Sequence, residues 1–136
     1  MIIGYTQGTY DMFHIGHLNL LRNAKRQCDY LIVGVNSDEL VRAYKNKTAI
    51  VPLEERMDIV GSIRFVDEVV ACDTLDKTVM HEKLHFDKIF IGDDWKGNPR
   101  WEKTEEDMKR MGAELIYLPH TSGTSSTMLR DKLKDY

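Results

Sequence analysis

No apolar run in this sequence approaches the roughly 18 residues of a membrane-spanning helix, so insertion into a membrane is not expected. The first residues, MIIGYTQGTYD, contain no basic stretch followed by an apolar one, so the sequence predicts no signal peptide. Cysteine is scarce as well, because Cys28 and Cys72 are too few for a disulfide framework. These absences together predict a protein of the reducing cytoplasm.

An excess of basic residues is also missing. The chain has 19 Lys and Arg residues against 22 Asp and Glu residues, which gives a formal net charge of −3. This balance excludes a broad basic surface, so we expect no nucleic acid partner. It is compatible with a small anionic ligand that a few local groups hold. No repeat, low-complexity tract or linker divides the chain, and residues 1–136 are predicted to form one domain.

Short apolar runs alternate with segments of helical spacing. The run YLIVGV at 30–35 is apolar almost throughout, as expected for a strand covered on both faces. Leu18, Leu21 and Ala24 recur at helical spacing, and Ser37 is a suitable helix N-cap. The predicted strands are 2–6, 30–35, 66–71, 88–91 and 114–118, and the predicted helices are 16–28, 53–64, 76–84, 101–111 and 126–134.

This alternation predicts an α/β fold with a Rossmann-like, five-stranded parallel sheet and helices on both faces. Ligands of such sheets bind beyond the carboxyl ends of the strands, near the point where the strand order switches. That rule directs attention to four polar or glycine-rich loops at 7–17, 36–56, 92–101 and 119–127. Within the second, residues 44–52 (YKNKTAIVP) are expected to form an irregular basic loop, and the chain's end, RDKLKDY, a solvated helix terminus.

The first of these loops leads into a helix that places two histidines together. His14 and His17 are three residues apart and share a face once the helix starts, while Gly16 leaves space beside them. Two imidazoles beside a positive helix end suit a polyphosphate, and as hydrogen-bond donors they could stabilise charge that develops on it. From spacing alone, two alternatives stay open: a metal site with at least one further ligand, and a pair of structural histidines with satisfied hydrogen bonds.

The last of these loops has the same character. Gly123 is followed by four hydroxyl residues at the start of the final predicted helix, at 124–127. Their hydroxyls and the free backbone N–H groups can either cap the helix or bind phosphate oxygens. Because two such helix starts follow strand ends, a site for a polyanion explains both loops together.

Four segments resemble the cytidylyltransferase family, a branch of the HxGH nucleotidyltransferase superfamily. They are GTYDMFHIGH at 8–17, RFVDEV at 64–69, GDDWKG at 92–97 and TSGTSST at 121–127, in the family's order and over essentially the whole chain. The resemblance implies a single nucleotidyltransferase catalytic domain over 1–136. It also implies attack by a substrate phosphate on the α-phosphorus of CTP, with release of pyrophosphate and with Mg²⁺ bound to the nucleotide. The favoured acceptor is glycerol 3-phosphate, and the resemblance further implies a homodimer.

The resemblance also assigns roles to residues of this chain. The residues expected to be catalytic are His14, His17, Lys45, Lys47 and Arg56. Those expected to bind the nucleotide are Thr9, Tyr10, Gly16, Arg64, Asp93, Thr121, Thr124, Ser125, Ser126 and Thr127. Those expected at the acceptor are Asp11, Asp94, Trp95 and His120, and no protein ligand to a metal is expected.

The chain departs from the family at one of these positions. The family usually has an arginine before the threonine of the last segment, but here the pair is His120 and Thr121. An arginine is always charged and can bind phosphate through two hydrogen bonds, which a neutral histidine cannot do. This substitution therefore bears on which acceptor and which nucleotide base the enzyme uses.

The sequence is also compatible with other functions. Phosphocholine, phosphoethanolamine or another polyol phosphate could be the acceptor, and Tyr44, Trp95 and Trp101 could form an aromatic cage for choline. ATP could replace CTP, and a non-catalytic nucleotide-binding module is a further alternative. His81 and His85 complete an H-E-x-x-H pattern, but a third zinc ligand is not evident and the segment falls outside the four loops.

Overall fold

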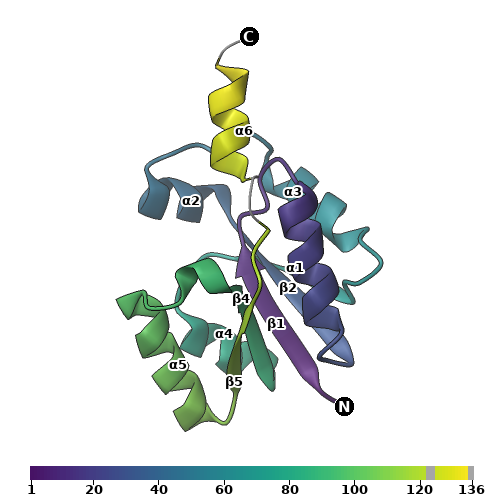
Figure 1. Ribbon diagram of the computed structural model, residues 1–136, viewed down its shortest axis with the longest axis vertical. Helices are drawn as coiled ribbons and strands as arrows, with labels where there is room; N and C mark the ends of the chain where they lie inside the picture. The colour runs from purple at the N-terminus through teal and green to yellow at the C-terminus, as the bar shows by residue number, and fades with distance from the viewer. Residues whose placement is uncertain (122–124, 135–136) are drawn as a thin grey trace.

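Five parallel strands form a single sheet in the order β3-β2-β1-β4-β5 (Figure 1). The structure is a computed structural model and describes residues 1–121 and 125–134. The strands are β1 (Ile3–Gly8), β2 (Tyr30–Asn36), β3 (Glu68–Cys72), β4 (Lys88–Gly92) and β5 (Glu114–Leu118). The predicted five-stranded parallel sheet is confirmed.

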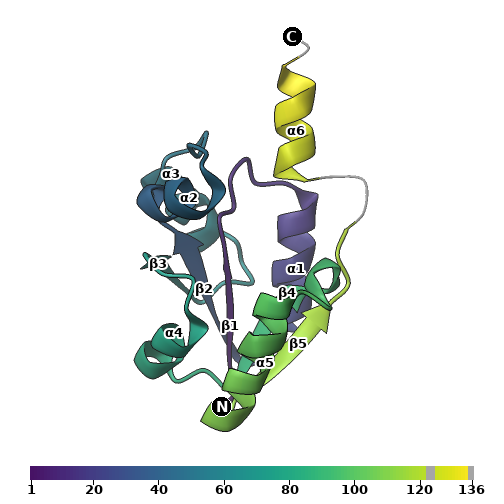
Figure 2. The ribbon, with the colours of Figure 1, turned by 90° about the vertical axis from the view of Figure 1, so that its left-hand side faces the viewer.

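Helices cover both faces of this sheet, which confirms the predicted layers (Figure 2). They are α1 (Ile15–Lys25), α2 (Asp38–Lys45), α3 (Leu53–Gly61), α4 (Lys77–Leu84), α5 (Pro99–Met111) and α6 (Ser126–Leu133), with a short 3₁₀ turn, η1, at Asp93–Trp95. Leu21 of α1 and Val60 of α3 are fully buried on one face, with Val33 of the sheet. On the other face, Met80 of α4 and Met108 of α5 are buried.

The central strands are apolar because both of their faces are covered. Leu31, Ile32, Val33 and Val35 of β2 are all buried, and they alternate between the two layers. Successive side chains of a strand point to opposite faces, so a continuous apolar run supplies both cores at once. In the part of the chain that the structure describes, no helix is long and apolar enough to cross a membrane.

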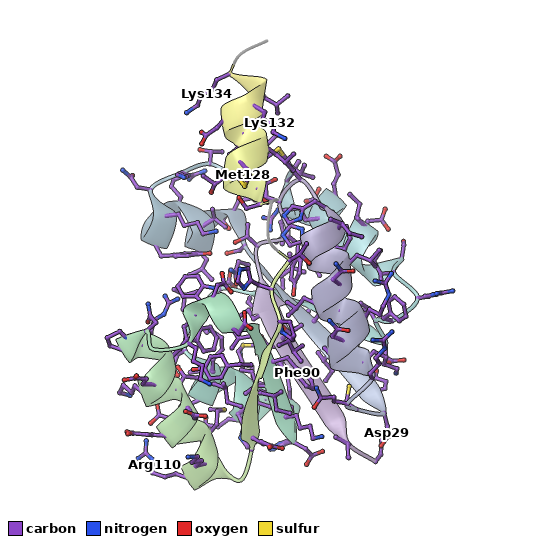
Figure 3. All side chains as sticks on the ribbon, viewed as in Figure 1. Asp29, Phe90, Arg110, Met128, Lys132 and Lys134 are labelled. Carbon is purple, nitrogen blue, oxygen red and sulfur yellow. The ribbon has the colours of Figure 1, made fainter. Side chains whose placement is uncertain are left out.

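The strand order switches between β1 and β4, so their carboxyl ends open a crevice for ligands. The segment after β1 and the turn after β4 meet at this edge of the sheet, and α6 follows β5 there (Figure 1). Figure 3 shows Met128 at the base of α6, and Lys132 and Lys134 further out on the part of this helix that projects beyond the body, whereas Phe90 lies in the core.

The boundaries of some elements differ from the prediction. Helix α2 continues to Lys45 and ends at Asn46, which has the left-handed conformation (φ 53°), so Lys45 lies in the last helical turn rather than in an irregular loop. Helix α1 ends at Lys25, three residues earlier than predicted. Strand β3 starts at Glu68 rather than at 66 because the backbone of 62–67 forms turns after α3.

Candidate active site

The segment between β1 and α1 fixes the two histidines through backbone hydrogen bonds. His14 is the N-cap of α1, and its Nδ1 accepts a hydrogen bond from the Gly16 amide (3.1 Å). The His14 amide in turn donates to Nδ1 of His17 (3.2 Å). The two rings stack with centroids 3.9 Å apart. The arrangement is a reciprocal capping box in which histidines take the places of the usual hydroxyl and carboxylate residues.

These bonds determine which ring nitrogens remain as donors. Because Nδ1 accepts in both rings, a neutral His14 or His17 carries its proton on Nε2. Burial lowers the pKa of His14 and, with a smaller contribution from the His14 ring, lowers the pKa of His17 to about 3. Both imidazoles are therefore uncharged at neutral pH, and each offers one Nε2–H group.

The backbone that leads to this cap is strained. Tyr10 and Met12 both have positive φ angles, 54° and 50°, which side-chain-bearing residues rarely adopt. The Tyr10 ring is buried and lies edge-on to His17, with centroids 5.2 Å apart, and its hydroxyl has no hydrogen-bond partner among the described residues. Tyr10 therefore supports the histidine ring from within the core.

A cavity of about 250 Å³, the inner histidine pocket, lies between the cap and α6. It is lined by the imidazole side chain of His17 and by two lysines, Lys45 and Lys47. The other residues that line it are Thr9, Tyr10, Asp11, Val41, Ser126, Thr127 and Arg130. Several predicted residues thus meet here, including both lysines and two of the hydroxyl residues at the start of α6.

Asp11 lines this pocket, but its carboxylate is engaged inside the protein. Its two oxygens accept hydrogen bonds from the amides of Ile50 (2.8 Å) and Val51 (2.9 Å), and it forms an ion pair with Arg130. Burial raises its pKa, but these partners outweigh burial and hold the pKa below its usual range. The predicted contact of Asp11 with the acceptor is therefore not the role that this geometry gives it. Asp11 instead joins the segment after α2 to α6.

Arg130 was not expected at the site, because RDKLKDY has the charge pattern of a solvated helix end. Its guanidinium pairs with Asp11, and its Nε is buried without a hydrogen-bond partner among the described residues. Ser126 strengthens the same contact by donating to the Asp11 carbonyl (2.5 Å). The start of α6 is therefore docked on the segment that leads to the histidine cap.

A second cavity of about 360 Å³, the outer histidine pocket, lies on the other side of His17. Its polar lining includes His14, Gly16, Asp94, Trp95, His120, Thr121, Ser125, Ser126 and Thr127, along with Lys45. The Thr121 hydroxyl accepts a hydrogen bond from the Asn19 side chain of α1 (2.9 Å). Ser125 is the N-cap of α6 and accepts from the Met128 amide (3.1 Å), so its hydroxyl is used for capping.

His120 is paired with an acidic partner at the rim of this pocket. Its Nδ1 lies 2.6 Å from Asp93 Oδ1, and this contact raises the pKa of His120 and lowers that of Asp93. When this ring is protonated, it supplies part of the positive charge that the missing arginine would have supplied. Asp93, Asp94 and His120 are also the one group of metal-ligand types that the described residues bring within 4.8 Å of one another, and all three are exposed.

A third cavity of about 210 Å³, the tryptophan pocket, opens at the same edge of the sheet, toward α4 and α5. Lys77 and Arg100 face it from the starts of these helices, beside Trp95 and Trp101. The other residues that line it are Gln7, Gly8, Thr9, Asn36, Tyr44, Lys45, Leu75 and Ile91. Lys77, Arg100 and Asn36 were not among the predicted site residues.

Arg56 corrects a prediction, because it faces none of these three cavities. Its side chain is buried, and all of its nitrogens have protein partners. Nε donates to the Val51 carbonyl (2.8 Å), Nη1 to the carbonyls of Thr9 (2.7 Å) and Asn36 (2.8 Å), and Nη2 pairs with Asp38 (2.6 Å). This guanidinium holds the segments after β1 and β2 together: four of its five N–H groups donate to the protein, and its side chain is buried away from the three cavities.

Arg64 also lies away from the cavities. It is exposed in the turn between α3 and β3, at the amino edge of the sheet, and its guanidinium sits over Phe65, 5.1 Å from the ring centroid. Arg64 lines none of the three cavities, and its predicted contact with the nucleotide stays a prediction. Thr124 lies outside the described residues.

The H-E-x-x-H segment does not form a metal centre with the residues described. His81 lies in α4, and His85 is the left-handed residue that ends it (φ 52°), with the two rings 6.3 Å apart and edge-on. No third ligand type joins them in the described ranges, so the zinc protease alternative has no structural support.

A doubly wound parallel sheet whose switch point carries a histidine cap, two lysines and a second helix start defines a nucleotidyltransferase-type protein. The chain belongs to the cytidylyltransferase-like family, which matches residues 5–132. Glycerol-3-phosphate cytidylyltransferase from Bacillus spizizenii is 38% identical over 92% of each chain. The protein of the same name from Staphylococcus aureus is 37% identical over 94% of this chain and 92% of its own.

Two further proteins, with other names, are also similar to this chain. FAD synthase from Thermococcus kodakarensis is 37% identical over 83% of this chain and 76% of its own. A lipopolysaccharide core biosynthesis protein from Thermoplasma volcanium has the same fold, with a TM-score of 0.79, 22% identity and coverage of 90% of this chain and 99% of its own.

Proposed function

We propose that this enzyme transfers the cytidylyl group of CTP to glycerol 3-phosphate and releases pyrophosphate. One observation carries the proposal. The uncharged imidazole donors of His14 and His17 lie beside the cationic tryptophan pocket, and Lys45 lines this pocket as well as the two histidine pockets. The family and the named relatives supply the reaction, and the two adjoining sites suit its two anionic substrates.

The reaction needs no nucleophilic side chain. An oxygen of the acceptor phosphate attacks the α-phosphorus of CTP and forms the new phosphorus–oxygen bond. The bond between the α-phosphorus and the bridging oxygen breaks, and pyrophosphate leaves with the electron pair. Catalysis of this kind depends on positioning and on stabilising the charge that develops on the phosphoryl oxygens.

The histidine pair suits that charge. We assign the Nε2–H groups of His14 and His17 to phosphoryl oxygens of CTP, where hydrogen bonds strengthen as charge accumulates. Their orientation is set by backbone amides before substrate arrives, so little reorganisation is needed during the reaction. Lys45 and Lys47 add positive charge beside them, and the hydroxyls of Ser126 and Thr127 add donors.

Magnesium fits this proposal as a part of the substrate. Asp11 is the carboxylate on the inner histidine pocket, and its oxygens already accept two amides and pair with Arg130. The oxygens that hold the ion are therefore expected to be those of the triphosphate, in agreement with the sequence-based expectation that magnesium binds with the nucleotide. When bound, magnesium neutralises part of the negative charge of the triphosphate. The homodimer and the cytoplasmic location stay predictions.

The decisive experiment is a pyrophosphate-release assay over four nucleoside triphosphates and a panel of phosphorylated alcohols, with and without a chelator. We expect turnover with CTP and glycerol 3-phosphate, and its loss in excess chelator. Turnover with ATP in place of CTP would favour an adenylyltransferase. CTP binding without turnover for any pair would leave a nucleotide-binding module and overturn the enzyme assignment.

A further inference from the structure

Arg130 of α6 lines the inner histidine pocket with donors that the protein itself does not use. Its side chain is 20% exposed, and its one side-chain hydrogen bond among the described residues runs from Nη2 to Asp11. Its Nε is enclosed by the protein. A guanidinium has five N–H groups, so the remaining donors on Nη1 and Nη2 are left for a ligand. A cation with free donors on the wall of a pocket favours an anion as its partner.

The inner histidine pocket carries more positive charge than the outer one. Lys45, Lys47 and Arg130 line the inner pocket, and its one carboxylate among the described residues, Asp11, already has protein partners. The outer pocket combines one lysine and a histidine with a carboxylate. The terminal phosphates carry most of the negative charge of CTP, and opposite charges attract most strongly at short distance. Charge therefore favours the inner pocket for the β- and γ-phosphates.

Arg130 also offers a group that the chain lacks elsewhere at this site. The family has an arginine at the position of His120, and this chain does not. Among the described residues that line the two histidine pockets, Arg130 is the one arginine. An arginine keeps its charge, and its planar fork matches two oxygens of a phosphate, which neither a lysine nor a neutral histidine can do. Helix α6 therefore supplies the kind of group that is missing at position 120.

The first turns of α6 present a face of donors to the inner histidine pocket. Arg130 follows Ser126 by four residues and Thr127 by three, so the three side chains share one face of the helix. All three line the pocket. Ser126 donates to the Asp11 carbonyl (2.5 Å), and Arg130 pairs with the Asp11 carboxylate, so one residue holds this face at two points. The guanidinium is therefore held at the pocket before a ligand arrives.

We propose that Arg130 binds the β- and γ-phosphates of CTP, the part of the nucleotide that leaves as pyrophosphate. Its ion pair with Asp11 orients the guanidinium, and the donors that Asp11 does not use bind the phosphate oxygens. The inference rests on the proposed function, because it takes CTP as the nucleotide. It does not involve the acceptor, whose proposed place is the tryptophan pocket, which Arg130 does not line.

The test measures binding of CTP, pyrophosphate and CMP by calorimetry, with magnesium and without an acceptor. Arg130→Gln should raise the dissociation constants of CTP and of pyrophosphate by about 10- to 100-fold, the loss expected for hydrogen bonds to a charged group. The dissociation constant of CMP should change less than about twofold. Lys132→Gln is the matched control, because this lysine is exposed on the same helix and lines none of the three cavities. It should leave all three values unchanged.

The measurement with CMP separates a phosphate contact from the docking of α6. Ser126 and Thr127 line both histidine pockets, so a loss of docking in Arg130→Gln would weaken CMP together with CTP. An equal loss for CMP and CTP would therefore overturn the inference, as would unchanged affinities for CTP and pyrophosphate. Arg130→Lys keeps the charge beside Asp11 but loses the planar fork, so its dissociation constant for CTP should lie between those of the wild type and of Arg130→Gln.

These outcomes are distinct from failure of the proposed function, because binding is measured without turnover. If the wild type binds CTP but turns over no pair of substrates, the reaction is wrong, and Arg130→Gln still reports on the phosphate contact. If the wild type turns over CTP and glycerol 3-phosphate while Arg130→Gln raises KM for CTP no more than Lys132→Gln does, the reaction stands and the assignment of Arg130 is wrong.

Discussion

The two ends of the proposed site offer different groups to an anion. At the histidine end, His14 and His17 are uncharged donors, and backbone amides fix them. At the tryptophan end, Lys77 and Arg100 are cations, and indole rings support them. One end therefore relies on orientation, and the other on charge.

This difference matches what each end is proposed to do. A cation attracts a phosphate dianion equally before and during the reaction, so it contributes mainly to binding. Prealigned neutral donors contribute most where charge appears only in the transition state. Changes at the histidine end should therefore act on kcat, and changes at the tryptophan end on KM for the acceptor.

The contrast between the two ends holds only if Arg56 is a structural residue and contacts neither substrate. Arg56→Met should lower the free energy of unfolding by about 3–5 kcal/mol, because it leaves buried carbonyls and Asp38 without their partner. Urea denaturation measures the change, with the exposed Arg26→Met as the control. A variant that keeps its stability but loses turnover would return Arg56 to the catalytic residues.

The largest catalytic effect is expected at the histidine end. His17→Ala removes an Nε2–H donor and should lower kcat by about 10²- to 10³-fold while KM for both substrates changes little. His81→Ala, a histidine of α4 outside the three cavities, should keep normal kcat. Near-normal turnover in His17→Ala would remove this residue from the proposed role.

At the tryptophan end, dependence on charge predicts dependence on pH. Burial, and then the nearby Arg100, lower the pKa of Lys77 to about 8, while Cys72 and Asp76 raise it. Lys77 is charged below this pKa and loses its charge as pH rises, so acceptor kcat/KM should fall about tenfold between pH 7 and 9. The substrate phosphate, with a second pKa of about 6, stays a dianion over this range.

Lys77→Arg provides the control for this titration, because an arginine stays charged at pH 9. Its acceptor kcat/KM should be nearly flat over the same range. The neutral His14 and His17 do not titrate there, since their pKa values are lowered. An equal fall in Lys77→Arg would assign the titration to another group.

The smallest effect separates the two functions of His14. Asparagine is a good N-cap and can accept from the Gly16 amide, but it has no Nε2–H. His14→Asn should therefore be about 1 kcal/mol more stable than His14→Ala, while both variants lose turnover to a similar extent. Thermal denaturation and kcat measure the two properties. Recovery of turnover in His14→Asn would mean that capping alone is the role of His14.

The fold could be predicted because its signals are local. The apolar run of β2 must be covered on both faces, and the helical spacing of Leu21 and Ala24 indicates one buried face. The histidine pair was predictable for the same reason, since a spacing of three residues and a helix start determine its geometry.

The rest of the site depends on contacts distant in sequence. The sequence-based prediction missed Lys77 because it included the loops after four strands but not the loop after β3, which ends at this residue. Arg130 has the charge of a solvated helix end, and only its contact with Asp11 brings it to the site. Arg56 was misassigned because a charge alone does not indicate whether a guanidinium finds phosphates or buried carbonyls.

Lys45 lines all three cavities, and this has a thermodynamic consequence. One ammonium group that both substrates can attract makes their affinities interdependent. By linkage, whatever factor CTP imposes on the dissociation constant of the acceptor, the acceptor must impose on that of CTP. Cooperativity between the two substrates would thus be a property of one side chain and would require no separate regulatory site.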